Sequence, residues 1–223
     1  MTATVVAVGD IEVRSLPSDP DAPREDDAAV DTLWASAAEQ SPLLFDGLVL
    51  CVVDVRLTPS GGVVTGRFER YRRVFAHLTH PDLCPDIRPV ATSAVTTVQG
   101  GVLVGRRSLD VTEYPGRLEL APTGSIDLGD AADGRVDWRG ALARELAEEV
   151  GVRIDPRAVR GLGLVHDTVH DVYDVIGGIE LVEAPPEASP EYSWLGVVAP
   201  AALVLPDLVP TSKAALELAG LVG

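Results

Sequence analysis

Three glutamates near the end of a predicted helix are the residues of this chain best placed to do chemistry. Glu145, Glu148 and Glu149 lie in the segment "RGALARELAEEVG" at positions i, i+3 and i+4, which a helix places on one face. Like charges at these spacings repel, and the helix dipole disfavours carboxylates at the C-terminal end. Such a run is usually a solvated acidic face. A hard divalent cation is favoured here, because Mg²⁺ takes oxygen ligands and is often shared with substrate phosphates.

A glycine-containing loop comes just before this helix. The segment "TGSIDLGD" places Gly124, Asp127, Gly129 and Asp130 directly after a predicted strand. Glycines let the backbone come close to a bound group, and backbone N–H groups can face an anion. Residues 124–152 therefore predict a site where a metal-bound phosphate meets acidic side chains.

The same segment resembles the signature box of the Nudix hydrolase family, G-x5-E-x7-R-E-U-x-E-E-x-G-U, in which U is an aliphatic residue. The second half of the box is complete, with Arg144, Glu145, Leu146, Glu148, Glu149, Gly151 and Val152. The first half departs from it, because Asp130 stands where the family has Glu, and thirteen residues instead of seven separate it from Arg144. We expect the extra residues, "AADGRVDW", to lengthen the loop before the helix and to leave the helix intact.

This resemblance implies hydrolysis of a diphosphate linked to another moiety, with Mg²⁺ or Mn²⁺ as the cofactor. By position, Glu145, Glu148 and Glu149 are the metal ligands. The implied catalytic residues are Glu145, Arg144 and Glu149, with Glu145 as a base that Arg144 orients. Clustered metals neutralise a diphosphate and lower the pKa of bound water, so water can attack phosphorus near neutral pH. The implied fold is a Nudix-type α/β/α sandwich with a mixed sheet.

A longer and less specific similarity implies a substrate class. The segment "LFDG" at 44–47, the hairpin after it and residues 88–127 resemble the Nudix branch that hydrolyses UDP-glucose and related nucleotide sugars. The resemblance implies a nucleoside-diphosphate sugar, while prenyl diphosphates and other nucleoside diphosphates stay open. A second class of function also stays open, a catalytically weak Nudix-fold module that binds a nucleotide or contacts a protein. The three intact helix glutamates favour the enzyme.

Further charged residues are candidates for the same site. Arg106 and Arg107 follow a predicted strand and, with Gly124, are the candidate substrate-binding residues. The alternative for the two arginines is one surface residue and one structural ion pair. Asp174 or Glu191 is a candidate for an additional metal ligand or base, since family members often draw a carboxylate from a later loop or strand, and nothing local selects between them.

Two other clusters have simpler interpretations. His166 and His170 lie in the strand region after the helix and lack the helical setting that makes HExxH a zinc site, so a histidine metal site is not expected. The densest basic cluster is expected to form an intramolecular network instead of a phosphate site; its members are Arg67, Arg70, Arg72 and Arg73.

The composition indicates a folded protein with an acidic surface. Apolar residues make up 46% of the 223 residues, and the formal net charge is −16. Nucleic acids and anionic membranes need a basic face, so neither is an expected partner. Cys51 and Cys84 are the only cysteines and form no CxxC, which predicts neither a disulfide framework nor a zinc site. The N-terminus lacks a basic region, and no apolar stretch reaches the ~18 residues of a membrane span. We expect a cytoplasmic protein that acts on a small-molecule diphosphate.

Strands and helices alternate along the chain in a mixed order, which predicts an α/β fold with a mixed sheet. Strands, some as hairpins, are expected within 2–16, 45–58, 61–71, 90–98, 102–108, 117–124, 159–183 and 193–205. Helices are expected over 27–39, 70–79 and 138–150 and near the C-terminus. Asp137 fits the N-cap of the third helix and Gly151 its C′ position. The Pro-rich loop at 80–89 is expected to separate an N-terminal α+β extension (1–88) from a Nudix hydrolase domain (89–223). We expect the extension to cap the site, to mediate a homodimer, or to do both.

Overall fold

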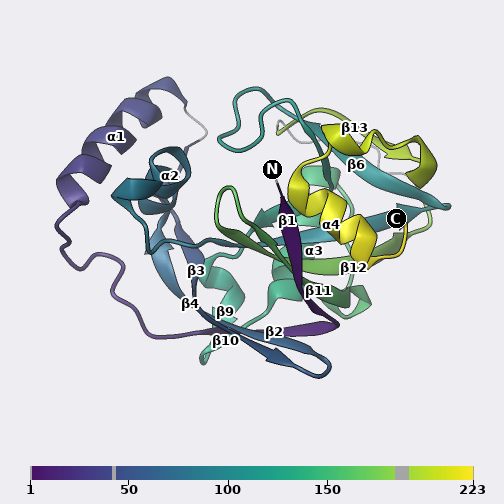
Figure 1. Ribbon diagram of the computed structural model, residues 1–223, viewed down its shortest axis with the longest axis horizontal. Helices are drawn as coiled ribbons and strands as arrows, with labels where there is room; N and C mark the ends of the chain where they lie inside the picture. The colour runs from purple at the N-terminus through teal and green to yellow at the C-terminus, as the bar shows by residue number, and fades with distance from the viewer. Residues whose placement is uncertain (1, 42–43, 184–190, 223) are drawn as a thin grey trace.

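Two mixed β-sheets organise the protein, and each takes strands from both sides of residue 88 (Figure 1). The computed structural model describes residues 2–41, 44–183 and 191–222. The larger, eight-stranded sheet has the order β1 (Ala3–Val8), β11 (Arg160–Asp167), β12 (Val172–Leu181), β5 (Val90–Val98), β6 (Gly101–Arg107), β13 (Tyr192–Val198), with β7 (Leu118–Leu120) beside β6 and β8 (Thr123–Ser125) beside β5. The five-stranded sheet has the order β3 (Leu48–Thr58), β4 (Gly61–Arg70), β2 (Asp10–Ser15), β10 (Arg135–Val136), β9 (Ala131–Ala132). The pairs β12–β5 and β2–β4 are parallel, and the neighbouring pairs are antiparallel.

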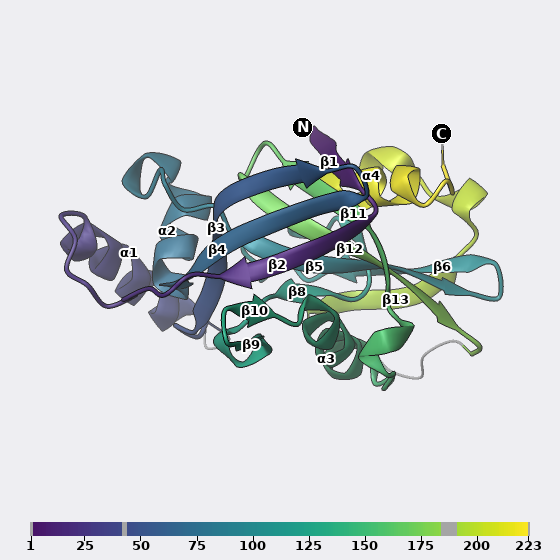
Figure 2. The ribbon, with the colours of Figure 1, turned by 90° about the horizontal axis from the view of Figure 1, so that it is seen from below.

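Helices cover both faces of the larger sheet. On one face, α3 (Trp138–Val150) and the smaller sheet share a core with it. On the other face, α4 (Pro210–Leu218) packs against β1 and β11. Figure 2 shows β3, β4 and β2 side by side in front of the larger sheet, with α3 below them. This arrangement confirms the predicted α/β/α sandwich with a mixed sheet.

The remaining helices lie near the N-terminal strands or in loops. The helices α1 (Asp27–Gln40) and α2 (Tyr71–Thr79) sit at one end of the molecule and share a third core with β3 (Figure 1). Short 3₁₀ helices are η1 (Pro81–Leu83), η2 (Leu128–Asp130), η3 (Pro156–Ala158), η4 (Pro200–Ala202) and η5 (Leu205–Asp207). The predicted helices at 27–39 and 70–79 are confirmed to within one residue at each end.

The helix α3 follows its sequence signals closely. The Asp137 side chain accepts a hydrogen bond from the Gly140 amide at 3.0 Å, and Gly151 adopts the left-handed conformation with φ 74°. Its buried stripe consists of Leu142, Leu146 and Val150, which are fully buried. The predicted cap, bounds and apolar face are all confirmed, so local sequence determines where this helix begins and ends and which residues form its buried stripe.

Residues 2–16 form two strands that lie in different sheets, so a hairpin within this segment is excluded. β1 pairs with β11 in the larger sheet, whereas β2 pairs with β4 in the smaller one. Gly9 makes the crossing with φ 108°, and its amide donates to the Leu162 carbonyl at 2.8 Å. A side chain at residue 9 would clash with the Ser60 backbone, so glycine is required at this crossing.

The residues inserted before α3 form a hairpin, so the expectation of a longer loop was wrong. Asp133 and Gly134 have φ values of 52° and 75°, as a type I′ turn between β9 and β10 requires. β10 then pairs with β2, which extends the smaller sheet. The Trp138 indole Nε1 donates to the Ile11 carbonyl at 2.8 Å. The first turn of α3 is thereby held by a strand from the N-terminal extension.

Two simpler expectations can be compared with the structure. Cys51 and Cys84 are free, in agreement with the expected lack of a disulfide framework, and both are buried. Across the described residues, the longest apolar helical segments fall short of what a membrane crossing requires. The division of the chain into two domains at residue 88 remains a prediction. β1 and β2, which precede residue 88, each pair with a strand that follows it.

Candidate active site

The three glutamates of α3 lie in different environments. The buried stripe faces the core, which leaves Glu145 and Glu149 against β8 and turns Glu148 toward solvent. The Glu148 side chain is 61% exposed, compared with 13% for the Glu145 side chain, and Glu149 as a whole is 3% exposed. Two of the predicted metal ligands therefore meet β8, while the third lies at the surface, 3.5 Å from the Arg144 guanidinium.

Gly124 lies directly beneath the Glu145 side chain. A Cβ at residue 124 would come within 2.5 Å of both Glu145 Cγ and Oε1, and closer still to Cδ. No side chain fits there without displacing the carboxylate. Gly124 lies in strand β8, paired with β5, and not in a loop as predicted. Its lack of a side chain allows a close approach between the β8 backbone and Glu145.

Arg144 joins the helix to the loop before it. Its Nη1 donates to Glu145 Oε1 at 2.7 Å, and its Nη2 donates to Asp130 Oδ2 at 3.1 Å. The same Asp130 oxygen accepts the Asp127 amide at 2.9 Å. Asp130 is one methylene shorter than the Glu of the family pattern and still reaches the guanidinium, which fixes Arg144 beside Glu145.

Glu149 is held from two other strands. Its Oε2 accepts from the Tyr192 hydroxyl of β13 at 2.8 Å and from the Thr123 amide of β8 at 3.3 Å. Thr123 in turn lines the cavity described next. Glu149 and Glu145 therefore both contact β8, Glu149 at Thr123 and Glu145 at Gly124.

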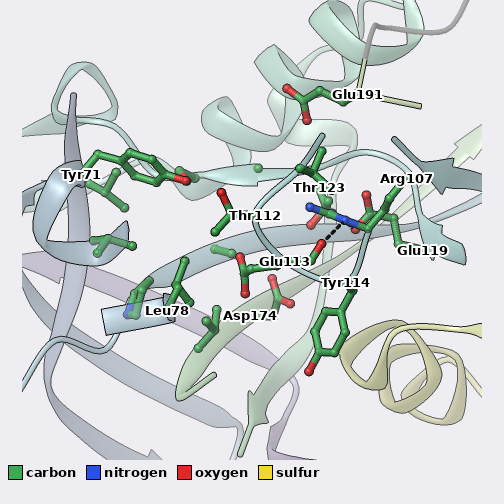
Figure 3. Close-up of a pocket in the computed structure, with 18 of the residues that line it drawn as sticks. Tyr71, Leu78, Arg107, Thr112, Glu113, Tyr114, Glu119, Thr123, Asp174 and Glu191 are labelled. Atoms are coloured by element: carbon green, nitrogen blue, oxygen red, sulfur yellow. Dashed lines mark hydrogen bonds and ion pairs between the residues drawn. The ribbon is translucent and has the colours of Figure 1, made fainter. Parts of the chain in front are cut away.

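A cavity of about 680 Å³ opens in front of β8 and has two chemically different ends (Figure 3). One end is acidic and includes Glu119, Glu145, Asp174 and Glu191 beside Thr123 and Gly124. The other end is apolar and is built largely by the N-terminal extension; its residues include Leu44, Phe45, Tyr71, Val74 and Leu78. In Figure 3, Tyr71 and Leu78 lie across the cavity from Arg107 and Glu119. Both of the alternative carboxylates considered from the sequence, Asp174 and Glu191, line this cavity.

Burial raises the pKa values of the carboxylates at the acidic end. It raises the pKa of Glu145 to about 7, although Arg144 partly opposes the shift. It raises the pKa of Glu119 to about 7 against the opposing charge of Arg107, and that of Asp174 to about 6 despite a hydrogen bond from Ser93. The pKa of Glu149 is raised as well, by burial and then by the Glu119 charge. Perturbed carboxylates in a cleft are typical of a functional site.

Two residues of this site were missed in the sequence. Glu119 lies in β7 between two leucines, and a single charge inside a short apolar strand just before the glycine loop was the available signal. Tyr192 opens β13 forty-three residues after Glu149, and no local pattern links the two. Only the tertiary fold brings the Tyr192 hydroxyl to the carboxylate.

The two candidate arginines point in different directions because they alternate on strand β6. Arg107 lines the cavity, forms an ion pair with Glu119 and donates from Nε to the Glu113 carbonyl at 2.8 Å. Arg106 is exposed and donates to the Gly116 carbonyl at 2.8 Å. Only Arg107 lies where a ligand in the cavity can meet it, and its guanidinium also braces the loop between β6 and β7.

The histidines and the basic cluster are engaged in contacts within the chain. His166 pairs with Asp171 at 2.6 Å, and His170 lies in the turn after β11, 3.3 Å from Glu113, so the two do not share a strand face. The predicted arginine network is confirmed; its ion pairs are Arg67–Glu69, Arg70–Asp21, Arg72–Asp46 and Arg73–Asp26. The arginine pairs therefore compensate charge within the extension.

The donors at the acidic end suit a hard divalent cation. Within residues 2–41, 44–183 and 191–222, no three His, Cys, Asp or Glu side chains converge into a preformed cluster. A Mg²⁺ or Mn²⁺ ion that works on phosphates does not need one, because it keeps waters and shares one or two carboxylates with the substrate. Glu145 and Glu149 supply oxygen donors whose charged forms are disfavoured by burial, and a cation would stabilise those charged forms.

Comparison with known proteins identifies the architecture. No family model and no curated protein matches the chain. Among solved structures, a bifunctional NMN adenylyltransferase/ADP-ribose pyrophosphatase from Francisella tularensis, complexed with AMP and a Mn ion, matches 65% of this chain and 45% of its own at 14% identity and TM-score 0.51. A Nudix hydrolase from Nitrosomonas europaea matches 57% and 67% at 17% identity and TM-score 0.46. The Nudix domain of Shewanella oneidensis NrtR, complexed with ADP-ribose, matches 59% and 85% at 20% identity and TM-score 0.48. At a TM-score of 0.51, the first of these structures shares its fold with the matched 65% of this chain.

Proposed function

We propose that this protein is a Nudix hydrolase that cleaves the diphosphate bond of a nucleoside-diphosphate-linked substrate with the help of Mg²⁺ or Mn²⁺. One observation carries the proposal: the Glu145 carboxylate rests on Gly124, at the acidic end of a cavity whose other end is apolar. An acidic end without a cation would repel a diphosphate, so the geometry favours a substrate that arrives together with a divalent ion.

The carboxylates of α3 and the residues that hold them have separate roles in this proposal. Glu145 and Glu149 would hold the metal, with the exposed Glu148 as a further candidate ligand. A bound divalent ion would neutralise charge on the diphosphate and lower the pKa of a coordinated water. The Glu145 carboxylate takes the proton of the attacking water. Arg144 keeps that carboxylate in place and is itself held by Asp130. Asp174 and Glu191 remain alternative sources of a further ligand or base.

The apolar end of the cavity supports a large group beyond the diphosphate. A volume of about 680 Å³ lies in the range of sites that enclose whole small molecules. Tyr71 and Phe45 offer aromatic surface suited to a nucleobase, and stacking of a base on an aromatic side chain is worth about 1–3 kcal/mol. Together with the sequence resemblance, this favours a UDP-sugar. Arg107 is the arginine retained near the substrate, because Arg106 is turned outward.

A substrate panel tests the proposal. Phosphate-containing products should be released from UDP-sugars with Mg²⁺ or Mn²⁺ and not with EDTA, and ADP-ribose, CoA and prenyl diphosphates serve as competing candidates. Glu149→Gln should lower turnover by orders of magnitude while the far-UV spectrum stays unchanged, because the substitution keeps the shape and removes a charged ligand. Undiminished turnover in this variant would refute the assignment. No turnover with any substrate, together with a ligand-induced thermal shift, would indicate a nucleotide-binding module instead.

A further inference from the structure

The Glu149 carboxylate is oriented by donors that reach it from two strands. The Tyr192 hydroxyl lies 2.8 Å and the Thr123 amide 3.3 Å from the same oxygen, Oε2. The two hydrogen bonds fix the position of Oε2, and the preference of donors for the plane of the carboxylate also limits its rotation. The Thr123 amide belongs to the backbone, so Tyr192 is the side chain that can add to this control.

Tyr192 is itself held rigidly. It is 6% exposed, and its ring lies on Gly105 of β6, where a Cβ would come within 2.5 Å of the ring atom Cε1. The pairing of β13 with β6 shifts register between Tyr192 and Trp194, and such bulges re-aim side chains. The phenol therefore enters the core at a fixed angle and ends on Glu149.

We propose that Tyr192 is a positioning residue that holds Glu149 Oε2 and so presents the Oε1 atom for a divalent cation. The inference rests on the proposed function, because it concerns the same metal site. Tyr192 does not line the cavity, so it acts through Glu149 and not through the substrate. Partners that orient a ligand in this way are typically worth a factor of about 10–100 in metal affinity.

Measurement of Mn²⁺ binding to the full chain without substrate tests this role. Calorimetry or the paramagnetic signal of free Mn²⁺ reports the affinity. Tyr192→Phe keeps the ring on Gly105 and removes only the hydroxyl, so we expect Mn²⁺ affinity to fall about 10-fold or more. At saturating Mn²⁺, kcat should fall while KM stays within about twofold, because substrate contacts are unchanged. In a Glu149→Gln background, Tyr192→Phe should add no further loss of affinity.

Tyr173→Phe is the matched control, because the Tyr173 ring stacks on His166 outside the cavity lining. It should leave Mn²⁺ affinity unchanged. Wild-type affinity in Tyr192→Phe, with or without a lower melting temperature, would assign Tyr192 a purely structural role and overturn the inference. A wild-type chain that binds Mn²⁺ but hydrolyses nothing, with weakened binding in Tyr192→Phe, would instead overturn the proposed function and leave the inference standing.

Discussion

Gly124→Ala is the smallest substitution that separates the proposed chemistry from the fold. The new Cβ would lie 2.5 Å from Glu145 Oε1 and Cγ. Heavy atoms pack at about 3.5 Å and Glu145 Cδ would lie closer still to the new Cβ, so the Glu145 side chain must move by at least about 1 Å. The backbone at residue 124 can accept alanine, since its φ is not positive. The displaced group is a side chain at a cavity wall, so movement of Glu145 can relieve the clash.

We expect this movement to lower kcat about 100-fold, because a 1 Å misplacement of a reacting group costs about that factor. The free energy of unfolding should change by less than about 1 kcal/mol. Steady-state kinetics with the best substrate of the panel and Mn²⁺, together with denaturant unfolding, measure the two effects separately.

Gly129→Ala is the matched control five residues further along, in η2, because a Cβ at residue 129 would meet no atom within 4 Å. Its kcat should stay at the wild-type value. Equal losses of kcat in both variants would indicate an effect of backbone flexibility over residues 124–129. Full activity in Gly124→Ala would show that the contact between residue 124 and Glu145 does not matter for turnover. Either result contradicts the reasoning.

Two further predictions concern stability. Trp138→Phe should lower the free energy of unfolding by roughly 2 kcal/mol or more, measured with urea, because it leaves a buried carbonyl of β2 without its donor and removes ring volume from the core. In EDTA, wild-type stability should fall as pH rises from 5 to 8. Burial raises the folded-state pKa of Glu145 and Glu119 to about 7, so the stability that protonation gives is present below their ordinary values near 4.5 and is lost through pH 7. Glu145→Gln should show a smaller fall in melting temperature over the same range, and an equal fall would contradict the pKa argument.

The parts of the site that depend on local sequence were predictable. The caps of α3 and the spacing of Leu142, Leu146 and Val150 fix which face is buried. The i, i+3, i+4 spacing could not show that Glu148 turns outward, because the position of β8 decides which side of the helix is covered. Helix geometry thus predicts neighbours along α3, but not which of them meet another element.

Long-range pairing explains the remaining differences. Alternation along β6 predicts that one of Arg106 and Arg107 faces inward, and only the neighbouring strands decide which. The Asp133-Gly134 pair is a hairpin signal that can be recognised in the sequence. The hairpin's strand β10 pairs with β2, which lies more than a hundred residues earlier, and that pairing could not be predicted locally. The same holds for Tyr192, whose contact with Glu149 depends on where β13 joins the sheet.

The N-terminal extension contributes to the site in two physically separate ways. Through β2 it holds the first turn of α3: the Ile11 carbonyl accepts the Trp138 indole, and Asp10 accepts from Arg139 at 2.6 Å. Through α2 it supplies the apolar end of the cavity with Tyr71. Changes in β2 should therefore alter the placement of the glutamates, whereas changes in α2 should alter which group fits beside the diphosphate. The helix α4 packs on the opposite face of the larger sheet through Ala214, Ala215 and Leu216, so mutations at these positions should act on stability before they act on the chemistry. Thr211 in its first turn is different, because it lines the cavity.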